Sequence, residues 1–336
     1  MNHLATDRLL QVPVIDIGRF AHGDAKAKAD IAGAVDAACR DIGFLVIAGH
    51  GIDRELIERT QAVSRRFFDL PIAEKMKVAK PAKDVTRGYI GVAEESVARS
   101  RDRSATAGDL NESFMIGPVD LPPVEYAQAS AAGKHFAPNL WPASPPELRE
   151  AYTDYYRAMS ALAGTLMRIF AIAIGVDEHF FDDKIDRHIS RLRVRNYPQQ
   201  LVEPLPGQIR AGAHSDYGSL TILAAEDKPG GLQVHNLAGD WVDVPIVPDT
   251  FIVNLGDLLA RWTNDRWVST LHRVVNPPAG SGAESRRQSL VFFHNPNYDA
   301  PIACLPHCAA PGESPRYAPT TSGEHLRALF VATQNG

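Results

Sequence analysis

The sequence predicts a mainly β fold with additional helices: a double-stranded β-helix, or jelly roll, flanked by a helical N-terminal portion. Three observations lead to this prediction. From Ser190 onward, short apolar segments rich in β-branched and aromatic residues follow one another, with turn residues between them. The N-terminal half instead combines two such segments with long stretches of helical periodicity. The sequence contains neither an internal repeat nor a clean linker, so we expect the chain to fold as one unit.

Residues 1–185 are predicted to form an α/β portion that packs on the barrel. The segments VPVID (12–16) and GFLVIAG (43–49) are typical of strands because they are rich in β-branched and aromatic residues. Apolar residues at helical spacing predict helices over 24–40 and 54–68. Helices and strands therefore alternate before the barrel begins.

A long helix is expected over 147–174. The proline-rich segment PASPPELRE precedes it and Gly175 ends it, which is the usual asymmetry of helix termini. Its apolar residues are spaced to pack against a sheet. The polar stretch 80–110 lacks such periodicity and is expected to be a surface loop or a lid.

Residues 186–300 are predicted to form the jelly-roll core, and residues 301–336 a C-terminal extension with a helix over 322–330. The predicted core strands are RLRVRNYP, SLTILAAE, GLQVH, WVDVP, FIVNLG, STLHRVVN and QSLVFFHN. Regular short strands broken by segments such as Pro-Gly-Gly favour a sandwich or a jelly roll.

Composition narrows the classes of function. The 336 residues carry a formal net charge of -5 and are 45% hydrophobic. No basic tract predicts nucleic-acid binding, and no apolar run is expected to span a bilayer. Three cysteines do not suggest a disulfide framework. We therefore expect a cytoplasmic protein, monomeric or weakly oligomeric, without a nucleic-acid or membrane partner.

His214, Asp216 and His272 form a candidate metal site. Residues two apart in a strand point to the same face, so His214 and Asp216 can hold one ion from a single strand. Two histidines and one carboxylate are the protein ligands of non-haem Fe(II) oxygenases, which keep other coordination positions open. A zinc hydrolase uses the same ligand types and is the alternative.

Arg287 and Ser289 form a candidate anion site. They too are two apart, and the segment SLVFF beside Arg287 is typical of a buried strand. An arginine near a metal is unfavourable unless an anion lies between them, which indicates a ligand with a carboxylate. Zinc hydrolysis gives no reason for this pair. Arg286 is a competitor, but its side chain would point to the opposite face.

A set of segments between residues 196 and 300 resembles a known family. Asn196-Tyr197-Pro198, AHSDYGSLTIL, GGLQV, FIVNLGDLL, RWVSTLHRVVNPP and RQSLVFFHNPNYDA occur in that order. Together with VPVIDIGRF and GFLVIAGHGI near the N-terminus, they resemble the isopenicillin N synthase-like branch of the Fe(II)/2-oxoglutarate-dependent dioxygenases. The segment AGSGAE makes the stretch between His272 and Arg287 longer than expected for this family.

The resemblance implies a cofactor set and a reaction. Fe(II) would be held by His214, Asp216 and His272. The co-substrate 2-oxoglutarate would contact Arg287 and Ser289, and Tyr197 through the match of its segment. With O2, such an enzyme oxidises a C–H bond of a small organic molecule, most often to an alcohol, and releases succinate and CO2. No catalytic residue beyond the metal ligands is expected.

Two other functions remain open. One is a 2-oxoglutarate-independent Fe(II) oxidase resembling isopenicillin N synthase, because such enzymes also carry an Arg-x-Ser pair. The other is a non-catalytic ligand-binding relative. The walls of the substrate site are expected from the C-terminal helix and the 80–110 segment, including Arg87 and Tyr89. Asn254 and Asp257 are expected in a tight turn, and Glu112 either near the site or in a structural ion pair.

Overall fold

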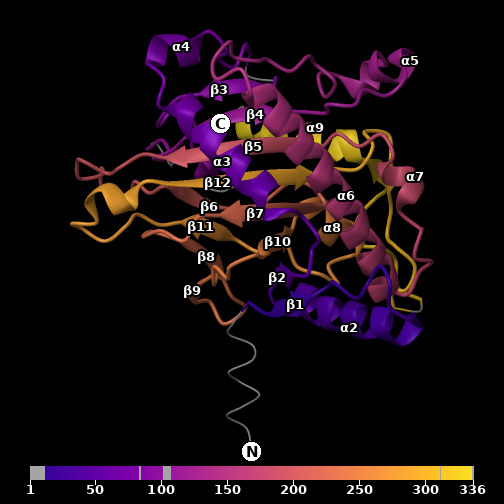
Figure 1. Cartoon of the computed structure of the whole chain (residues 1–336). Coiled ribbons are helices and arrows are strands. Elements are labelled where there is room, and N and C mark those ends of the chain that lie inside the picture. Colours follow the sequence, from indigo (N-terminus) through magenta and orange to yellow (C-terminus); the bar gives the residue numbers. More distant parts are fainter. Residues whose placement is uncertain (1–11, 83–84, 101–106, 311, 335–336) are drawn as a thin grey trace, which may run out of the picture.

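A computed structural model describes residues 12–82, 85–100, 107–310 and 312–334 of the chain. It confirms the jelly-roll core with a helical N-terminal part (Figure 1). The large sheet has the order β1 (Val14–Asp16), β2 (Phe44–Ala48), β10 (Phe251–Leu255), β7 (Leu220–Ala225), β12 (Arg287–His294), β5 (Arg191–Tyr197), β4 (Glu112–Ile116) and β3 (Gly88–Ile90). The smaller sheet has the order β6 (Ala211–His214), β11 (His272–Val274), β8 (Leu232–His235) and β9 (Trp241–Asp243). The short strands β13 (Pro301–Ile302) and β14 (Thr320–Thr321) pair with each other.

The long predicted helices are present. They are α2 (Ala25–Asp41), α3 (Arg54–Phe68), α6 (Leu148–Ile174) and α9 (Ser322–Gln334). The Asp24 carboxylate accepts a hydrogen bond from the Ala27 amide at 2.8 Å and so caps α2. Gly175 ends α6 with a φ of 90°, a left-handed conformation that glycine adopts without steric cost.

Shorter helical elements connect these parts. They are α4 (Ile72–Met76), η1 (Val97–Ser100), α5 (Val124–Ala127), η2 (Ser130–Ala132), α7 (Asp182–Ile185), α8 (Asp257–Trp262) and η3 (Gly282–Ser285). The sequence patterns predicted neither α8 nor the strands β3 and β4. Both of these strands lie in the large sheet, so strands from both sides of residue 185 share it.

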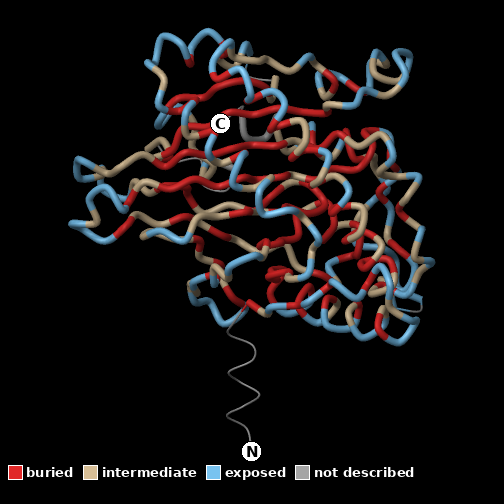
Figure 2. The backbone as a smooth tube through the Cα atoms, viewed as in Figure 1, coloured by how far each residue is buried: buried red, intermediate tan, exposed pale blue. Residues whose placement is uncertain are grey.

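Helix α6 covers the outer face of the large sheet, where α2 and α3 pack beside it (Figure 1). Its buried side chains, among them Tyr152 and Phe170, belong to the largest apolar core of the protein. The interior elements are buried and the peripheral loops exposed (Figure 2). Burial of this apolar surface is the main favourable term that holds the helical layer on the sheet.

Helix α6 also corrects one expectation. By length and composition it is apolar enough to cross a membrane, although no such segment was expected. Half of its most apolar 18-residue window is buried inside the protein. Length and composition are therefore weak evidence for a membrane span.

The inner face of the large sheet is lined by alternate residues of its strands. In β5, Leu192 and Val194 belong to the core under α6, whereas Tyr197 belongs to a second core inside the barrel. Because side chains alternate across a strand, Arg193 and Arg195 share the inner face with Tyr197. The interior of the barrel is therefore apolar at one end and cationic along β5.

A buried ion pair joins β4 to α4 on the helical side of the sheet. The Glu112 carboxylate lies 2.7 Å from the Lys75 ammonium and accepts hydrogen bonds from the Tyr89 hydroxyl (2.6 Å) and the Asn196 amide (2.8 Å). All four residues are buried. Of the two roles that the sequence left open for Glu112, the structure shows the structural ion pair.

We expect Glu112→Ala to destabilise the fold by about 3–5 kcal/mol, because Lys75 would keep a buried charge without its partner. Urea denaturation measures this loss. Glu74→Ala is the control, since it removes an exposed ion pair with Lys77 and should leave the midpoint nearly unchanged. Equal midpoints for the two variants would contradict this role of Glu112.

Candidate metal and anion site

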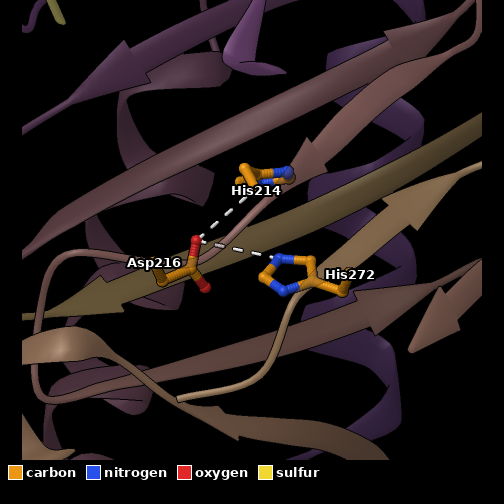
Figure 3. Close-up of side chains that lie close together, drawn as sticks. All are labelled: His214, Asp216 and His272. Atoms are coloured by element: carbon orange, nitrogen blue, oxygen red, sulfur yellow. Dashed lines mark ion pairs between the residues drawn. The ribbon is translucent and has the colours of Figure 1, made fainter. Parts of the chain in front are cut away.

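The three candidate metal ligands lie close together, with their ligand atoms directed toward one another (Figure 3). His272 of β11 is directly opposite His214 of β6 in the antiparallel pairing of these strands. The Asp216 Oδ1 lies 4.0 Å from the His214 Nε2 and 3.9 Å from the His272 Nε2. One ion between these atoms would contact all three. The expectation of a single strand was wrong in one respect, because β6 ends at His214 and Asp216 lies in the following loop.

Backbone carbonyls fix the orientation of both histidine rings. The His214 Nδ1 lies 2.7 Å from the Gly212 carbonyl, and the His272 Nδ1 lies 3.1 Å from the Thr270 carbonyl. Each Nδ1–H therefore donates to a carbonyl two residues earlier and leaves the Nε2 lone pair directed toward Asp216. Burial and the neighbouring His272 lower the pKa of His214 to about 3, so this imidazole is neutral near pH 7.

Two residues that the sequence patterns did not reveal hold Asp216. Its Oδ2 accepts hydrogen bonds from the Thr221 hydroxyl (2.5 Å) and the Asn254 amide (2.8 Å), which leaves Oδ1 facing the histidines. Burial opposes ionisation, but His272, His214 and these two hydrogen bonds together hold the pKa of Asp216 below its usual value. The carboxylate is therefore ionised and oriented.

Asn254 was expected in a tight turn, which was wrong. Strand β10 continues through Asn254 to Leu255, and Gly256 then precedes helix α8. A Cβ at Gly256 would collide with the Gly218 carbonyl, so a side chain here would force the chain away from the Asp216 loop. The Asp257 amide donates to the Asp216 carbonyl at 2.7 Å and joins α8 to the same loop.

The candidate anion residues lie on the inner face of the large sheet. Arg287 is opposite Tyr197 in the pairing of β12 with β5, and its guanidinium lies 5.4 Å from the Tyr197 ring. Arg287 and Ser289 are buried, and within the described part of the chain the Arg287 Nε and the Ser289 Oγ have no hydrogen-bond partner. Buried polar groups are usually paired, so these two atoms indicate a ligand with acceptor oxygens.

Arg286 faces the other way. Its guanidinium pairs with the Asp69 carboxylate at 2.7 Å, on the helical side of the sheet. This agrees with the strand register that assigned the anion role to Arg287 rather than to its neighbour.

A second buried arginine beside the anion site was missed. The Arg210 guanidinium lies 5.5 Å from the Tyr197 ring and, like Arg287, donates to the Gly230 carbonyl. Burial and the nearby Arg287 lower the pKa of Arg210 to about 10. Arg210 directly precedes β6, so the alternation of side chains in that strand did not indicate its position. Two cations in one apolar interior favour an anionic ligand there.

A cavity of about 810 Å³ opens beside His214 and Asp216. Its walls include β5, residues 94–97 and helix α9. The C-terminal helix and the 80–110 segment thus lie at the cavity, although 83–84 and 101–106 are outside the described residues. Arg87 and Tyr89 do not line it, contrary to expectation. Tyr89 is turned toward Glu112 on the helical side, and Arg87 donates to the His135 carbonyl.

Comparison with known proteins identifies the family. Residues 12–144 match the N-terminal model of the non-haem dioxygenases described for morphine synthesis, and residues 188–296 match the 2OG-Fe(II) oxygenase superfamily. A 2-oxoglutarate-Fe(II) type oxidoreductase of Emericella nidulans is 36% identical over 326 residues, which cover 95% of this chain and 89% of the relative. The chain belongs to the Fe(II)/2-oxoglutarate-dependent dioxygenases, in the isopenicillin N synthase-like branch. Membership confirms the predicted cofactors Fe(II), 2-oxoglutarate and O2.

Other relatives differ in what they act on or bind. Validamycin A dioxygenase of Streptomyces hygroscopicus subsp. limoneus is 32% identical over 298 residues, covering 88% of this chain and 79% of the relative. A Neurospora crassa protein solved in complex with alpha-KG and thymine matches with a TM-score of 0.83 and 33% identity, covering 96% of this chain and 97% of that one. The fold is thus shared by proteins with unlike small-molecule ligands.

We expect Thr221→Val to weaken binding of a divalent metal ion by about 10-fold or more, because Asp216 loses one of the hydrogen bonds that orient it. Calorimetric titration with Mn(II) under anaerobic conditions measures this. Thr263→Val is the matched control, since its buried hydroxyl bonds to helix α8 and the Trp267 amide, away from Asp216. Equal metal affinity in both variants would exclude an orienting role for Thr221.

Proposed function

We propose that this enzyme hydroxylates a C–H bond of a small organic molecule, with His214, Asp216 and His272 as the iron ligands. The proposal for the ligands rests on their ligand atoms, which all lie within 4.8 Å of one another. It is supported by the neutral state of His214 and the ionised state of Asp216, the forms in which these side chains bind a metal.

We further propose that Arg287, Ser289 and Tyr197 hold the distal carboxylate of 2-oxoglutarate. This proposal depends on the buried Arg287 Nε and Ser289 Oγ, which have no hydrogen-bond partner among the residues that the structure describes. Within residues 12–82, 85–100, 107–310 and 312–334, Arg287 has no carboxylate at ion-pair distance, and Glu226 nearby is paired with Arg65. A guanidinium and a hydroxyl on one face suit a planar carboxylate.

Some residues of the site would hold the metal ion, and others orient or pack against its ligands. Bound Fe(II), with O2 and 2-oxoglutarate, supplies the oxidising power, and 2-oxoglutarate leaves as succinate and CO2. The histidines present neutral Nε2 atoms, and Asn254 with Thr221 keeps Asp216 from turning away. Phe44 packs edge-on against the His272 ring at 5.3 Å and keeps water from its inner side. No side chain is required to move a proton in this scheme.

Anaerobic titration of the Fe(II) protein with 2-oxoglutarate tests the proposal against its two alternatives. A metal-to-ligand charge-transfer band, followed by O2-dependent succinate, is the expected result. An oxidase independent of 2-oxoglutarate would take up O2 without either signal. A non-catalytic relative would show no O2 uptake, and His214→Ala would change nothing.

We expect Arg287→Gln to raise the Kd for 2-oxoglutarate by about 10- to 100-fold, the usual effect of losing hydrogen bonds to a charged group. Mn(II) affinity should not change. Arg286→Gln is the control at the next position, since its side chain pairs with Asp69 outside the barrel. Equal loss of 2-oxoglutarate binding in both variants would contradict the assignment of Arg287.

A further inference from the structure

The cavity beside the metal ligands carries more positive than negative charge. Among the residues that the structure describes, seven cationic and five anionic side chains line it, together with the aromatic rings of Phe293, Tyr298 and Phe330. One of the five anionic side chains, Asp216, is itself a candidate metal ligand. A cavity with this lining favours an anionic small molecule with an apolar body.

Among the arginines of β5, Arg191 is the one that the strand register aligns with Thr221, which holds Asp216. It begins β5 opposite Phe293 of β12, and Phe293 is in turn opposite Thr221 of β7. Two strand spacings of about 4.8 Å therefore separate the backbone of Arg191 from that of Thr221, which holds Asp216. A group bound by Arg191 would lie within one small molecule's length of the metal site.

Arg191 differs from the other arginines of its strand. Arg193 pairs with the Glu95 carboxylate at 2.8 Å, and Arg195 donates to the Asn111 side chain at 3.1 Å. Among the described residues the Arg191 side chain has neither an ion pair nor a hydrogen bond, and its guanidinium lies 5.1 Å from the Phe330 ring. Burial, together with Arg87 and Arg193, lowers the pKa of Arg191 to about 10, so it is still charged near pH 7.

We propose that Arg191 binds a carboxylate of the substrate, and that the substrate is a small organic acid oxidised at a carbon held near the metal. This inference rests on the proposed function and adds the chemical class of the substrate. A planar guanidinium suits a carboxylate because two parallel N–H donors meet its two oxygens. The Phe330 ring covers the guanidinium and reduces its contact with water, which strengthens such a pair.

A structural role is the alternative for Arg191. The cation–π contact with Phe330 alone would hold helix α9 against the barrel. That role predicts a lower melting temperature for Arg191→Gln without any change in ligand preference. The two roles therefore differ in a binding measurement.

The test uses the full chain loaded with Mn(II) and saturating 2-oxoglutarate, titrated calorimetrically under anaerobic conditions. The probes are benzoate and phenylacetate, each compared with its amide, because aromatic rings line the cavity. We expect each acid to bind at least about 10-fold more tightly than its amide. Arg191→Gln should weaken binding of the acids by about 10- to 100-fold and leave the amides unchanged. Arg191→Lys should recover part of the loss.

Arg327→Gln is the control, because it removes another positive charge from the same cavity. It should weaken binding of the acids far less than Arg191→Gln. Failure of 2-oxoglutarate to bind the wild-type protein would overturn the proposed function itself. If 2-oxoglutarate binds, three results would overturn the carboxylate proposal: no binding of either acid, equal binding of acids and amides, or equal losses in the two variants.

Discussion

The pairing of β12 with β5 and β7 is the constraint on which the interior depends. This register turns Arg287, Ser289 and Phe293 inward and Leu290 and Phe292 toward the core under α6. A shift by one residue would exchange the two faces, so that the polar groups would meet α6 and the apolar ones the cavity. The apolar contacts of the outer face thus select the arrangement of the inner one. The same hydrogen bonds between β12 and its two neighbours therefore determine both the stability of the sheet and the geometry of the site.

Several guanidinium groups lie inside the barrel. Burying a charge is costly, so each such group needs a compensating partner. The Glu95 carboxylate forms ion pairs with both Arg193 and Lys80. Burial opposes the ionisation of Glu95, but these two cations lower its pKa to about 2. Arg210 uses backbone carbonyls instead. Arg287 and Arg191 face the proposed ligand sites, where the carboxylate of a bound molecule would offset the same cost.

Spacing within one segment could be predicted from the sequence, and contacts between segments could not. Arg287 and Ser289 lie two apart in β12 and share its inner face, as their spacing predicts. His214 and Asp216 also meet, although Asp216 lies in the loop after β6. Asn254 was misassigned because Gly256 suggests a turn, whereas strand β10 runs through Asn254 to Leu255. Gly256 instead allows its backbone to lie close to the Gly218 carbonyl. The orientation of Asp216 by Thr221 and Asn254 depends on strands that are neighbours only in space.

Similarly, Tyr89 was expected at the substrate site, and the pairing of β3 with β4 turned it to the opposite face. Helix α9 belongs to the cavity wall but lies after every barrel strand in the chain. A ligand that contacts both Arg191 and Phe330 would touch the barrel and this helix at once. Ligand binding would then stabilise the packed position of α9, relative to its detached state, by RT ln(1 + [L]/Kd). Occupancy of the cavity would thereby protect the C-terminal helix from local opening, which links ligand concentration to proteolytic resistance at that end of the fold.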